Sequence, residues 1–235
     1  MSTDPQDSVH LPKHVGLILD GNRRWAKAKG LKTIDGHREG AETFKKVSLA
    51  AFERGVKYLS AFVFSTENWQ RATDEVSFLM KLMVRAVELH LDEFHKNNIK
   101  IVILGERDGL NKSVVSSLQR TEAKTAGNTG GTLALCFNYG GKTELVHAIK
   151  QIAASGMSVG DINEQTIDAY MYQPQIPGID LLIRTSGEKR TSGFMLWRSD
   201  YAELCFVDKM WPDFNVQDLD IALVDYANRH RRFGK

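Results

Sequence analysis

The residues best suited to chemistry lie in the stretch 14–25, where a short apolar run is followed by an aspartate and then by two arginines. Residues 15–19 are almost all apolar, which is typical of a strand buried on both faces of a parallel sheet. Asp20 follows this run, and Arg23 and Arg24 open a short helical segment. A carboxylate there can hold a divalent cation, and the arginines can hold phosphate oxygens. The stretch indicates a site for a metal-bound diphosphate; the alternative is a solvated surface turn.

Two further polar loops follow predicted strands and carry the same kinds of side chain. Residues 65–71 have the sequence STENWQR, and residues 184–192 have the sequence RTSGEKRTS. Ligands of open α/β sheets bind outside the carboxyl ends of the strands, so we expect all three loops to share one edge of a sheet. Arginines, hydroxyl groups and glycines together suit diphosphates, which need bidentate donors and close backbone approach.

The elements that must position these loops alternate between strands and helices. Apolar runs predict strands at 15–19, 56–64, 99–104, 132–137 and 179–183, with further short runs at 194–197 and 204–207. Helical periodicity and capping signals predict helices at about 25–30, 36–54, 74–95, 111–125, 143–154, 163–172 and 216–229. This alternation predicts one α/β domain over residues 14–235, with a central, mostly parallel sheet flanked by helices on both sides. Residues 1–13 are polar and are expected to form a flexible leader.

The longest predicted helix, 74–95, is apolar on two sides. One stripe begins at Val76 and ends at Phe94, and a second runs from Phe78 to Leu89. A helix with two apolar faces is expected to be buried between other parts of the molecule. Plain core packing and the lining of an apolar cavity or a subunit contact both fit this pattern.

The composition is that of an ordinary globular protein, with 42% hydrophobic and 26% charged residues in a chain of 235. A net charge of +2 does not favour a nucleic-acid binder. No secretory signal and no long apolar stretch is found, so we expect a cytoplasmic protein that can still touch a membrane peripherally. Cys136 and Cys205 lie in apolar runs and are predicted to be buried and reduced.

The glycine-rich segments do not favour nucleotide binding. GNTGGT and NYGGKTE lack the spacing of a phosphate-binding loop, and no GxGxxG follows a predicted strand. The aspartate-rich DDxxD pair expected of an all-helical trans-type prenyl synthase is also missing. Turn geometry is the simpler role for these glycines, and a nucleotide-dependent phosphotransferase has little support.

Six segments, in this order and spacing, resemble the cis-prenyltransferase (undecaprenyl diphosphate synthase) family: HVGLILDGNRRWA, GHREG, FSTENWQR, FNYGG, IDLLIRTSGEKRTSGF and DYAEL. The resemblance covers about residues 14–235. FNYGG alone is weak, whereas DGNxRWA together with RTSGE and the later AEL is specific. The resemblance implies a six-stranded cis-prenyltransferase fold with an apolar tunnel, for which the helix at 74–95 and the strand at 99–104 are candidate walls.

The resemblance implies a Mg²⁺-dependent reaction. The enzyme would add isopentenyl diphosphate to an allylic diphosphate, which by this likeness is farnesyl diphosphate, and form cis double bonds in a growing prenyl chain. The implied product is undecaprenyl diphosphate, a precursor of the carrier lipid for cell-wall synthesis. Asp20 would hold Mg²⁺ against the allylic diphosphate and help to ionise it, with Glu203 as a second ligand. Asn68 would accept a proton; because a neutral amide is a poor base, the alternative is that it orients a diphosphate oxygen that does so.

The implied substrate-binding residues come from all three loops. Those for the allylic diphosphate are Gly21, Asn22, Arg23, Arg24 and His37. Those around the reacting carbons are Ser65, Glu67, Asn68, Trp69 and Arg71. Those for isopentenyl diphosphate are Arg184, Arg190, Thr191 and Ser192. Trp25 and Thr66 are counted with the substrate-binding residues as well.

Three other features bear on the resemblance. Arg232 and Gly234 resemble the family's terminal Arg-x-Gly, which implies a homodimer whose tail reaches the partner's site. Thr33 stands where the family usually has an arginine, with Lys32 as a possible source of charge, and Gly193 stands where it has an asparagine.

Two alternatives stay open: a short- or medium-chain member of the family, and a non-catalytic lipid-binding subunit. The second is disfavoured because such subunits lose the aspartate and arginines that this chain keeps.

Overall fold

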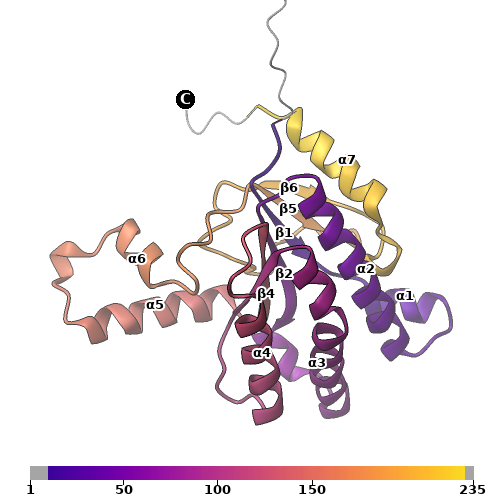
Figure 1. The fold of residues 1–235 in the computed structure, drawn as a ribbon, viewed down its shortest axis with the longest axis horizontal. Helices are drawn as coiled ribbons and strands as arrows, with labels where there is room; N and C mark the ends of the chain where they lie inside the picture. The colour runs from indigo at the N-terminus through magenta and orange to yellow at the C-terminus, as the bar shows by residue number, and fades with distance from the viewer. Residues whose placement is uncertain (1–9, 231–235) are drawn as a thin grey trace, which may run out of the picture.

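The computed structural model describes residues 10–230 (Figure 1). Most of the predicted leader, 1–13, lies outside the described residues, and so do Arg232 and Gly234. Within 10–230, no helix is both long enough and apolar enough to cross a membrane.

A six-stranded sheet forms the centre of the molecule, and all its neighbouring strands are parallel. The strands are β1 (His14–Ile18), β2 (Tyr58–Ser65), β3 (Ile99–Leu104), β4 (Gly131–Tyr139), β5 (Leu181–Arg184) and β6 (Glu203–Phe206). Their order is β3-β4-β2-β1-β5-β6. The first connection places β2 on one side of β1, and a later part of the chain places β5 on the other side of β1. The carboxyl ends of β2, β1 and β5 are therefore neighbours, and the predicted sheet is confirmed.

Seven α-helices connect and cover the strands: α1 (Asn22–Ala28), α2 (Thr33–Glu53), α3 (Thr73–Lys96), α4 (Lys112–Thr125), α5 (Gly141–Ser155), α6 (Glu164–Tyr170) and α7 (Val216–Ala227). Three short 3₁₀ helices, η1 (Thr66–Gln70), η2 (Val159–Asp161) and η3 (Trp211–Asp213), are additional to the predicted elements. A capping box helps to form η1, because Ser65 and Asn68 bond each other's backbone.

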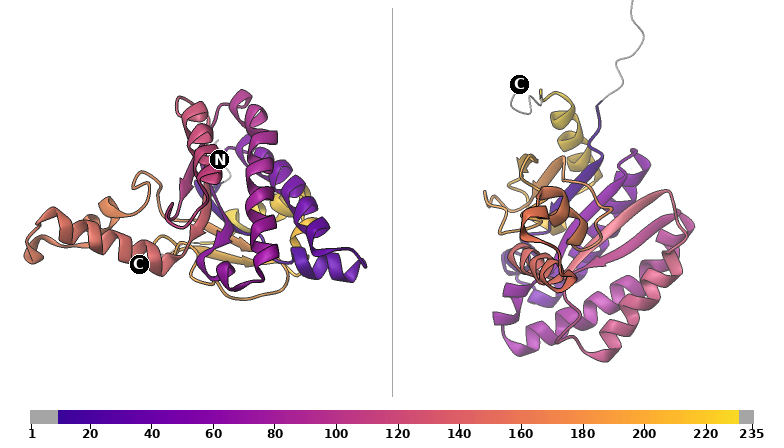
Figure 2. Two further views of the ribbon diagram at one scale, coloured as in Figure 1. Left: turned by 90° about the horizontal axis from the view of Figure 1, so that it is seen from below. Right: turned by 90° about the vertical axis from the view of Figure 1, so that its left-hand side faces the viewer.

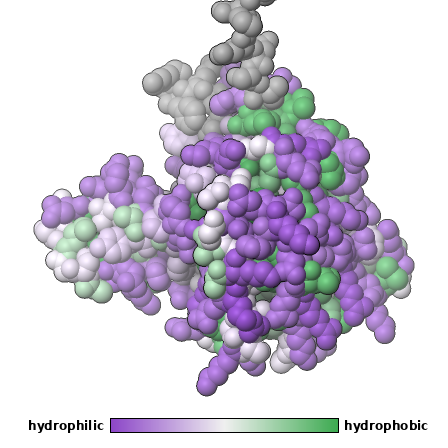
Figure 3. All heavy atoms as spheres, viewed as in Figure 1, coloured by the Kyte–Doolittle hydropathy of each residue, from purple (hydrophilic) through white to green (hydrophobic). Residues whose placement is uncertain are grey.

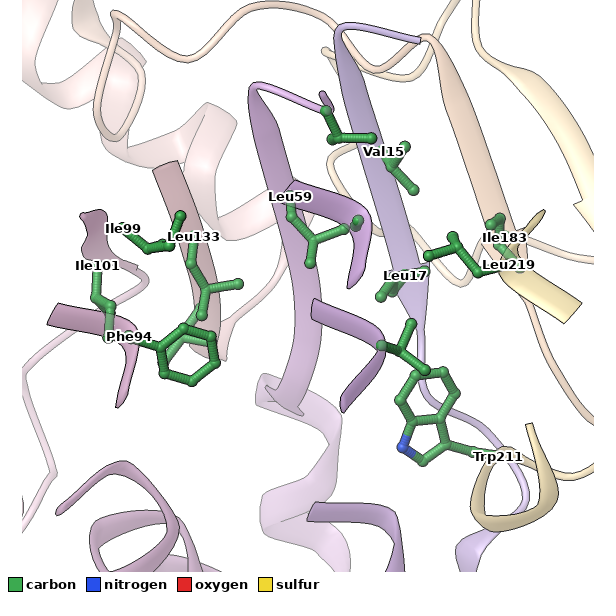
Figure 4. Close-up of a cluster of buried hydrophobic side chains, with 14 of the residues drawn as sticks. Val15, Leu17, Leu59, Phe94, Ile99, Ile101, Leu133, Ile183, Trp211 and Leu219 are labelled. Atoms are coloured by element: carbon green, nitrogen blue, oxygen red, sulfur yellow. The ribbon is translucent and has the colours of Figure 1, made fainter. Parts of the chain in front are cut away.

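The main core fills the space between one face of the sheet and helices α2, α3, α4 and α7. Leu17, Leu59 and Leu133 stand on three different strands along this face (Figure 4). Phe94 of α3 and Trp211 of η3 pack against the same side. Burial of such side chains is the main favourable term in folding, so this face holds the sheet and the helices together.

The second face differs from the expectation of helices on both sides. Its buried residues pack against Ile176, Ile179, Phe194 and Met195, which lie in irregular segments and turns and not in helices. Ile179 lies so close that a Cβ on Gly16 would come within 2.8 Å of its side chain. Helices α5 and α6 pack against each other and project from the body as an arm (Figures 1 and 2).

The two cysteines are free, as predicted, but only one is buried. Cys136 lies inside β4 and is fully buried. Cys205 is half-buried, contrary to the prediction, because β6 is the last strand of the sheet and has a neighbour on one side only.

Candidate active site

Asp20 lies just beyond β1, where Gly21 lets the chain turn into α1. Gly21 is the residue before α1 and has a φ of 111°, a left-handed value that favours glycine. A Cβ there would also come within 2.9 Å of Met210. The turn places the Asp20 carboxylate beside Arg184, whose Nη2 donates to Asp20 Oδ2 at 2.9 Å. The first and third predicted loops therefore meet, as their shared edge requires.

Arg184 is a buried arginine that fastens its own loop to Asp20. Its side chain is 5% exposed. Nη1 donates to the carbonyl oxygen of Arg190 and, at 2.8 Å, to Ser192 Oγ. Nε is buried without a partner among the described residues, so its N–H is free to donate to a ligand.

Glu188, which was not among the predicted site residues, joins two arginines of the site. Its Oε1 accepts from Arg24 Nη1 at 3.1 Å, and its Oε2 accepts from Arg190 Nη1. Arg24 also donates to Ser186 and lies 3.5 Å from Asp20. The segment RTSGEKR could have predicted this role for Glu188, because the acid stands next to basic residues and can hold their positive charges near one another.

A large cationic cavity opens beside Asp20. Its volume is about 1000 Å³. Five basic residues line it: Arg23, Arg24, Lys27, Lys32 and Arg71. Asp20 is the one acidic residue in the lining, while Gly21, Asn22, Thr33 and His37 are also part of it. Lys32 and Thr33 lie side by side in the lining, so a lysine is present where the family's arginine is missing. Lys27 was not among the predicted site residues. It follows Arg23 by four positions on α1, so the sequence could have placed both side chains on the same face of the helix.

A second cavity of about 620 Å³ lies between the sheet, α2 and α3. Its apolar wall includes Leu79, Leu82, Met83, Ala86 and Val87 of α3 and Ile101, Leu133, Leu135 and Phe137 of the sheet. The predicted cavity walls, α3 and β3, are therefore confirmed. The two cavities share Leu19, Asp20, Asn22, His37 and Arg71. A polar mouth thus adjoins an apolar interior.

Two titratable groups at this shared boundary have lowered pKa values. Burial alone would raise the pKa of Asp20, but the hydrogen bond and charge of Arg184, together with Arg24, hold it below its usual value. Burial lowers the pKa of His37 to about 4, and the charges of Arg71 and Arg23 act in the same direction. At neutral pH Asp20 is ionised and His37 is neutral. His37 Nε2 is buried and unpartnered within the described chain, so the imidazole can offer a hydrogen bond but no charge.

The 65–71 loop lies at the mouth of the apolar cavity. Ser65, Glu67, Asn68 and Arg71 all line it. The backbone N–H of Ser65 donates to Asn68 Oδ1 at 3.2 Å, so this oxygen is already occupied. Arg71 donates to Glu75 Oε1 at 3.1 Å.

Five predicted substrate-binding residues line neither cavity, and Arg190, whose side chain bonds Glu188, is one of them. Trp25 is buried and donates through Nε1 to Asp213 Oδ1 at 2.7 Å. Trp69 is 43% exposed and donates to Asn138 Oδ1 at 2.7 Å. Thr66 lies beside Gly140, where a Cβ would come within 2.6 Å of its Oγ1. Thr191 is half-buried in the 184–192 loop. Their substrate contacts stay predictions.

Glu203 is also distant from Asp20 within one chain. It is the first residue of β6 and pairs in register with Leu181, whereas Arg184 pairs with Phe206. Glu203 is therefore offset from Arg184 by three residues along the strand direction, which corresponds to about 10 Å. The Glu203 carboxylate accepts from Arg229 Nη1 at 2.9 Å. Its role as a metal ligand stays a prediction that one chain alone does not support.

Asp20 fits a Mg²⁺ ion that takes most of its ligands from substrate. Among residues 10–230, no cluster of three or more histidine, cysteine or acidic side chains is suited to a metal. Mg²⁺ is commonly held by one or two carboxylates together with waters and substrate phosphates. Asp20 is ionised and 30% exposed beside the cationic cavity, so it can serve as such a carboxylate.

A cationic mouth over an apolar interior, at the carboxyl ends of parallel strands, defines a class of enzyme that handles diphosphates with apolar tails. The undecaprenyl diphosphate synthase family model matches residues 18–234. The chain belongs to this family of cis-prenyltransferases, and it is an isoprenyl transferase that elongates cis-prenyl chains.

Individual relatives agree with this assignment. "Isoprenyl transferase 2" of Corynebacterium glutamicum is 45% identical over 228 residues, which cover 95% of this chain and 94% of that protein. The ditrans,polycis-undecaprenyl-diphosphate synthase ((2E,6E)-farnesyl-diphosphate specific) of Micrococcus luteus is 42% identical, covering 97% of this chain and 93% of that protein. The crystal structure of lavandulyl diphosphate synthase from Lavandula x intermedia, in complex with dimethylallyl diphosphate, matches with a TM-score of 0.93 and 32% identity, covering 97% of this chain and all of that one.

Proposed function

We propose that the enzyme condenses isopentenyl diphosphate with farnesyl diphosphate, in the presence of Mg²⁺, and extends it to undecaprenyl diphosphate. One observation carries this proposal: the cationic and apolar cavities meet at Asp20 and His37. A prenyl diphosphate has the matching shape, with an anionic head and an apolar tail. The Micrococcus luteus relative, whose name specifies farnesyl diphosphate and the undecaprenyl product, supports the choice of substrates.

The residues of the mouth hold the two diphosphates. Arg23, Arg24 and Lys32 bind the allylic diphosphate, and neutral His37 donates a hydrogen bond to it. Mg²⁺ at Asp20, when bound, would stabilise the negative charge of the departing diphosphate. Arg184 would donate its free Nε–H to isopentenyl diphosphate. Fixed positive groups of this kind act mainly by positioning and by charge stabilisation.

The proton lost in each condensation goes to a diphosphate oxygen. Asn68 is a poor base because its amide is neutral, and its Oδ1 already accepts from the Ser65 backbone. Its side-chain N–H₂ group can instead donate to a diphosphate and orient it. Asn68 is then a positioning residue.

The tail of the growing product occupies the apolar cavity. Each five-carbon unit that leaves water contributes about 4 kcal/mol, at roughly 0.8 kcal/mol per carbon. This favours retention of the intermediate through successive additions. The product is proposed as the precursor of the carrier lipid for cell-wall synthesis, which a cytoplasmic enzyme would pass to the membrane by transient peripheral contact.

We also propose a homodimer in which the C-terminal tail, with Arg232 and Gly234, reaches the partner's site. The arm formed by α5 and α6 supports a second copy, because it exposes apolar side chains that one chain leaves uncovered (Figure 3). Ile149 is 58% exposed and Val159 is 84% exposed. Exposed apolar surface of this kind is common where copies of a chain associate.

The direct test is incubation with Mg²⁺, radiolabelled isopentenyl diphosphate and farnesyl diphosphate, followed by chromatography of the chains. A long-chain product supports the full proposal. A product of only a few units favours a short- or medium-chain synthase, a candidate kept open by the likeness to lavandulyl diphosphate synthase. No incorporation with several allylic starters, by a protein shown to be folded, would contradict the proposed reaction.

Substitution of Leu79 or Met83 by tryptophan is expected to shorten the products. Both side chains line the apolar cavity, and a larger indole there removes space that the tail needs. The product distribution of each variant, compared with the parent, is the measurement. Leu89→Trp is the matched control, because Leu89 lies on the same helix but is 71% exposed. Unchanged products in Leu79→Trp and Met83→Trp would show that the tail lies elsewhere.

Removal of the last four residues is expected to lower activity by about 10²-fold, the usual effect of losing one group that stabilises charge. If the tail acts on the partner's site, mixing the truncated protein with full-length Asp20→Ala protein should restore activity. Only the mixed dimer then combines an intact Asp20 site with a donated tail. Activity of the truncated protein equal to that of the parent would refute the role of the tail, and failure of the mixture to recover would refute its action in trans.

A further inference from the structure

Two polar side chains interrupt the apolar wall of the deeper cavity, away from its mouth. Lys45 of α2 and His90 of α3 both line the cavity, and their side chains are 22% and 10% exposed. Each is paired with an acid on the other helix. His90 Nε2 lies 3.3 Å from Glu42 Oε1, and Lys45 Nζ lies 3.4 Å from Glu93 Oε2. We call these four residues the α2–α3 clasp.

The clasp lies deeper than the mouth: on α2, Lys45 follows the mouth residue His37 by eight positions, about 12 Å at 1.5 Å per residue. Glu75, near the start of α3, bonds the mouth residue Arg71, and His90 follows 15 positions later. At 1.5 Å per residue this is about 22 Å along the helix. Phe94, one turn beyond His90, also lines the cavity. The clasp therefore joins α2 to α3 in the distal part of the cavity, and the stretch of α3 before it forms the apolar wall.

The two acids of the clasp face the outside. Glu42 and Glu93 are 44% and 46% exposed, and neither lines the cavity. Polar contacts with one partner in solvent are weak, so each can separate and form again. An apolar chain end that reaches Lys45 and His90, however, meets polar groups that give it no favourable burial. The clasp is thus a closed but separable boundary between the cavity and the surface.

We propose that the α2–α3 clasp limits the length of the prenyl product. A chain that has filled the apolar cavity can grow further only by displacing the two pairs and passing between the helices. Growth therefore slows when the chain end reaches Lys45 and His90. This inference rests on the proposed function and adds to it the residues that determine product length.

The test is the product distribution of His90→Leu, Lys45→Met and the double variant. Leucine and methionine keep much of the side-chain volume while removing the polar groups, so the boundary becomes apolar. We expect products to become longer by at least one five-carbon unit, most of all in the double variant. Glu42→Gln changes an exposed partner and leaves the cavity wall intact. It should lengthen the products less than the wall variants do, and it tests the proposal if a wall variant fails to fold.

Glu88→Gln is the matched control. Glu88 is also an acid on α3 and also joins a neighbouring helix, through Arg120 of α4 at 2.9 Å, but it does not line the cavity. Its products should equal those of the parent. If the parent elongates and the folded clasp variants give unchanged or shorter products, the clasp does not limit length and the proposed function stands. If the parent incorporates no isopentenyl diphosphate, the proposed function fails and this inference fails with it.

Discussion

Replacement of Asp20 by alanine should lower kcat by about 10³-fold, the size expected when a preorganised charge at a reacting centre is lost. Among the described residues, Asp20 is the one acidic residue that lines both cavities, and Glu67 lines the apolar cavity alone. Without it, no ionised carboxylate in the cationic lining remains to hold Mg²⁺. Steady-state rates at saturating substrates, with varied Mg²⁺, are the measurement.

The Asp20→Asn variant tests the charge of the Asp20 side chain separately from its size. The amide keeps the size of the side chain and can still accept from Arg184, yet it is a poor ligand for Mg²⁺. We expect it to be nearly as inactive as Asp20→Ala. Asp220→Ala, which removes an exposed aspartate paired with Arg54, the residue that follows α2, should keep the parental rate. Activity of Asp20→Asn close to the parent would mean that the carboxylate does not act through a metal.

Replacement of Arg184 by methionine should affect both catalysis and stability. The side chain bonds Asp20, Ser192 and the Arg190 backbone, so its loss releases the 184–192 loop and leaves Asp20 without its nearest cation. We expect kcat/KM for isopentenyl diphosphate to fall by about 10²- to 10³-fold. The free energy of unfolding should fall by about 2 kcal/mol, since hydrogen bonds to charged groups contribute roughly that much. Kinetics and urea unfolding measure the two effects.

Two variants define what Arg184 does. Arg184→Lys keeps the charge but cannot make the three contacts of the guanidinium, so it should recover little activity. Arg190→Met removes the same charge from the same loop, but its side chain is 60% exposed and bonds Glu188 alone among the described residues. It should raise KM with little change in stability. Equal loss of stability in Arg190→Met and Arg184→Met would contradict the structural role assigned to Arg184.

The local elements and the basic character of the site followed from the sequence alone. Continuous apolar runs predict buried parallel strands, and turn residues mark where they end, so Asp20, Ser65 and Arg184 could be placed at strand ends. The two apolar faces of α3 indicated a helix buried against more than one surface, and it does line a cavity. These features depend on residues close together in the chain, and short-range patterns report them directly.

Only the tertiary structure decided which distant residues meet. Glu188 lies 164 positions from Arg24, yet bonds it, because β5 pairs with β1 in the sheet. Glu203 belongs to one of the family's sequence motifs, yet it lies at the amino end of β6, whereas Arg184 of the site lies at the carboxyl end of the neighbouring strand β5. The pairing register of these two strands determines this separation. The pairs Glu42–His90 and Lys45–Glu93 depend on how α2 lies against α3. Periodicity shows which face of an element is apolar, but strand order and helix packing, which no local pattern encodes, determine what that face contacts.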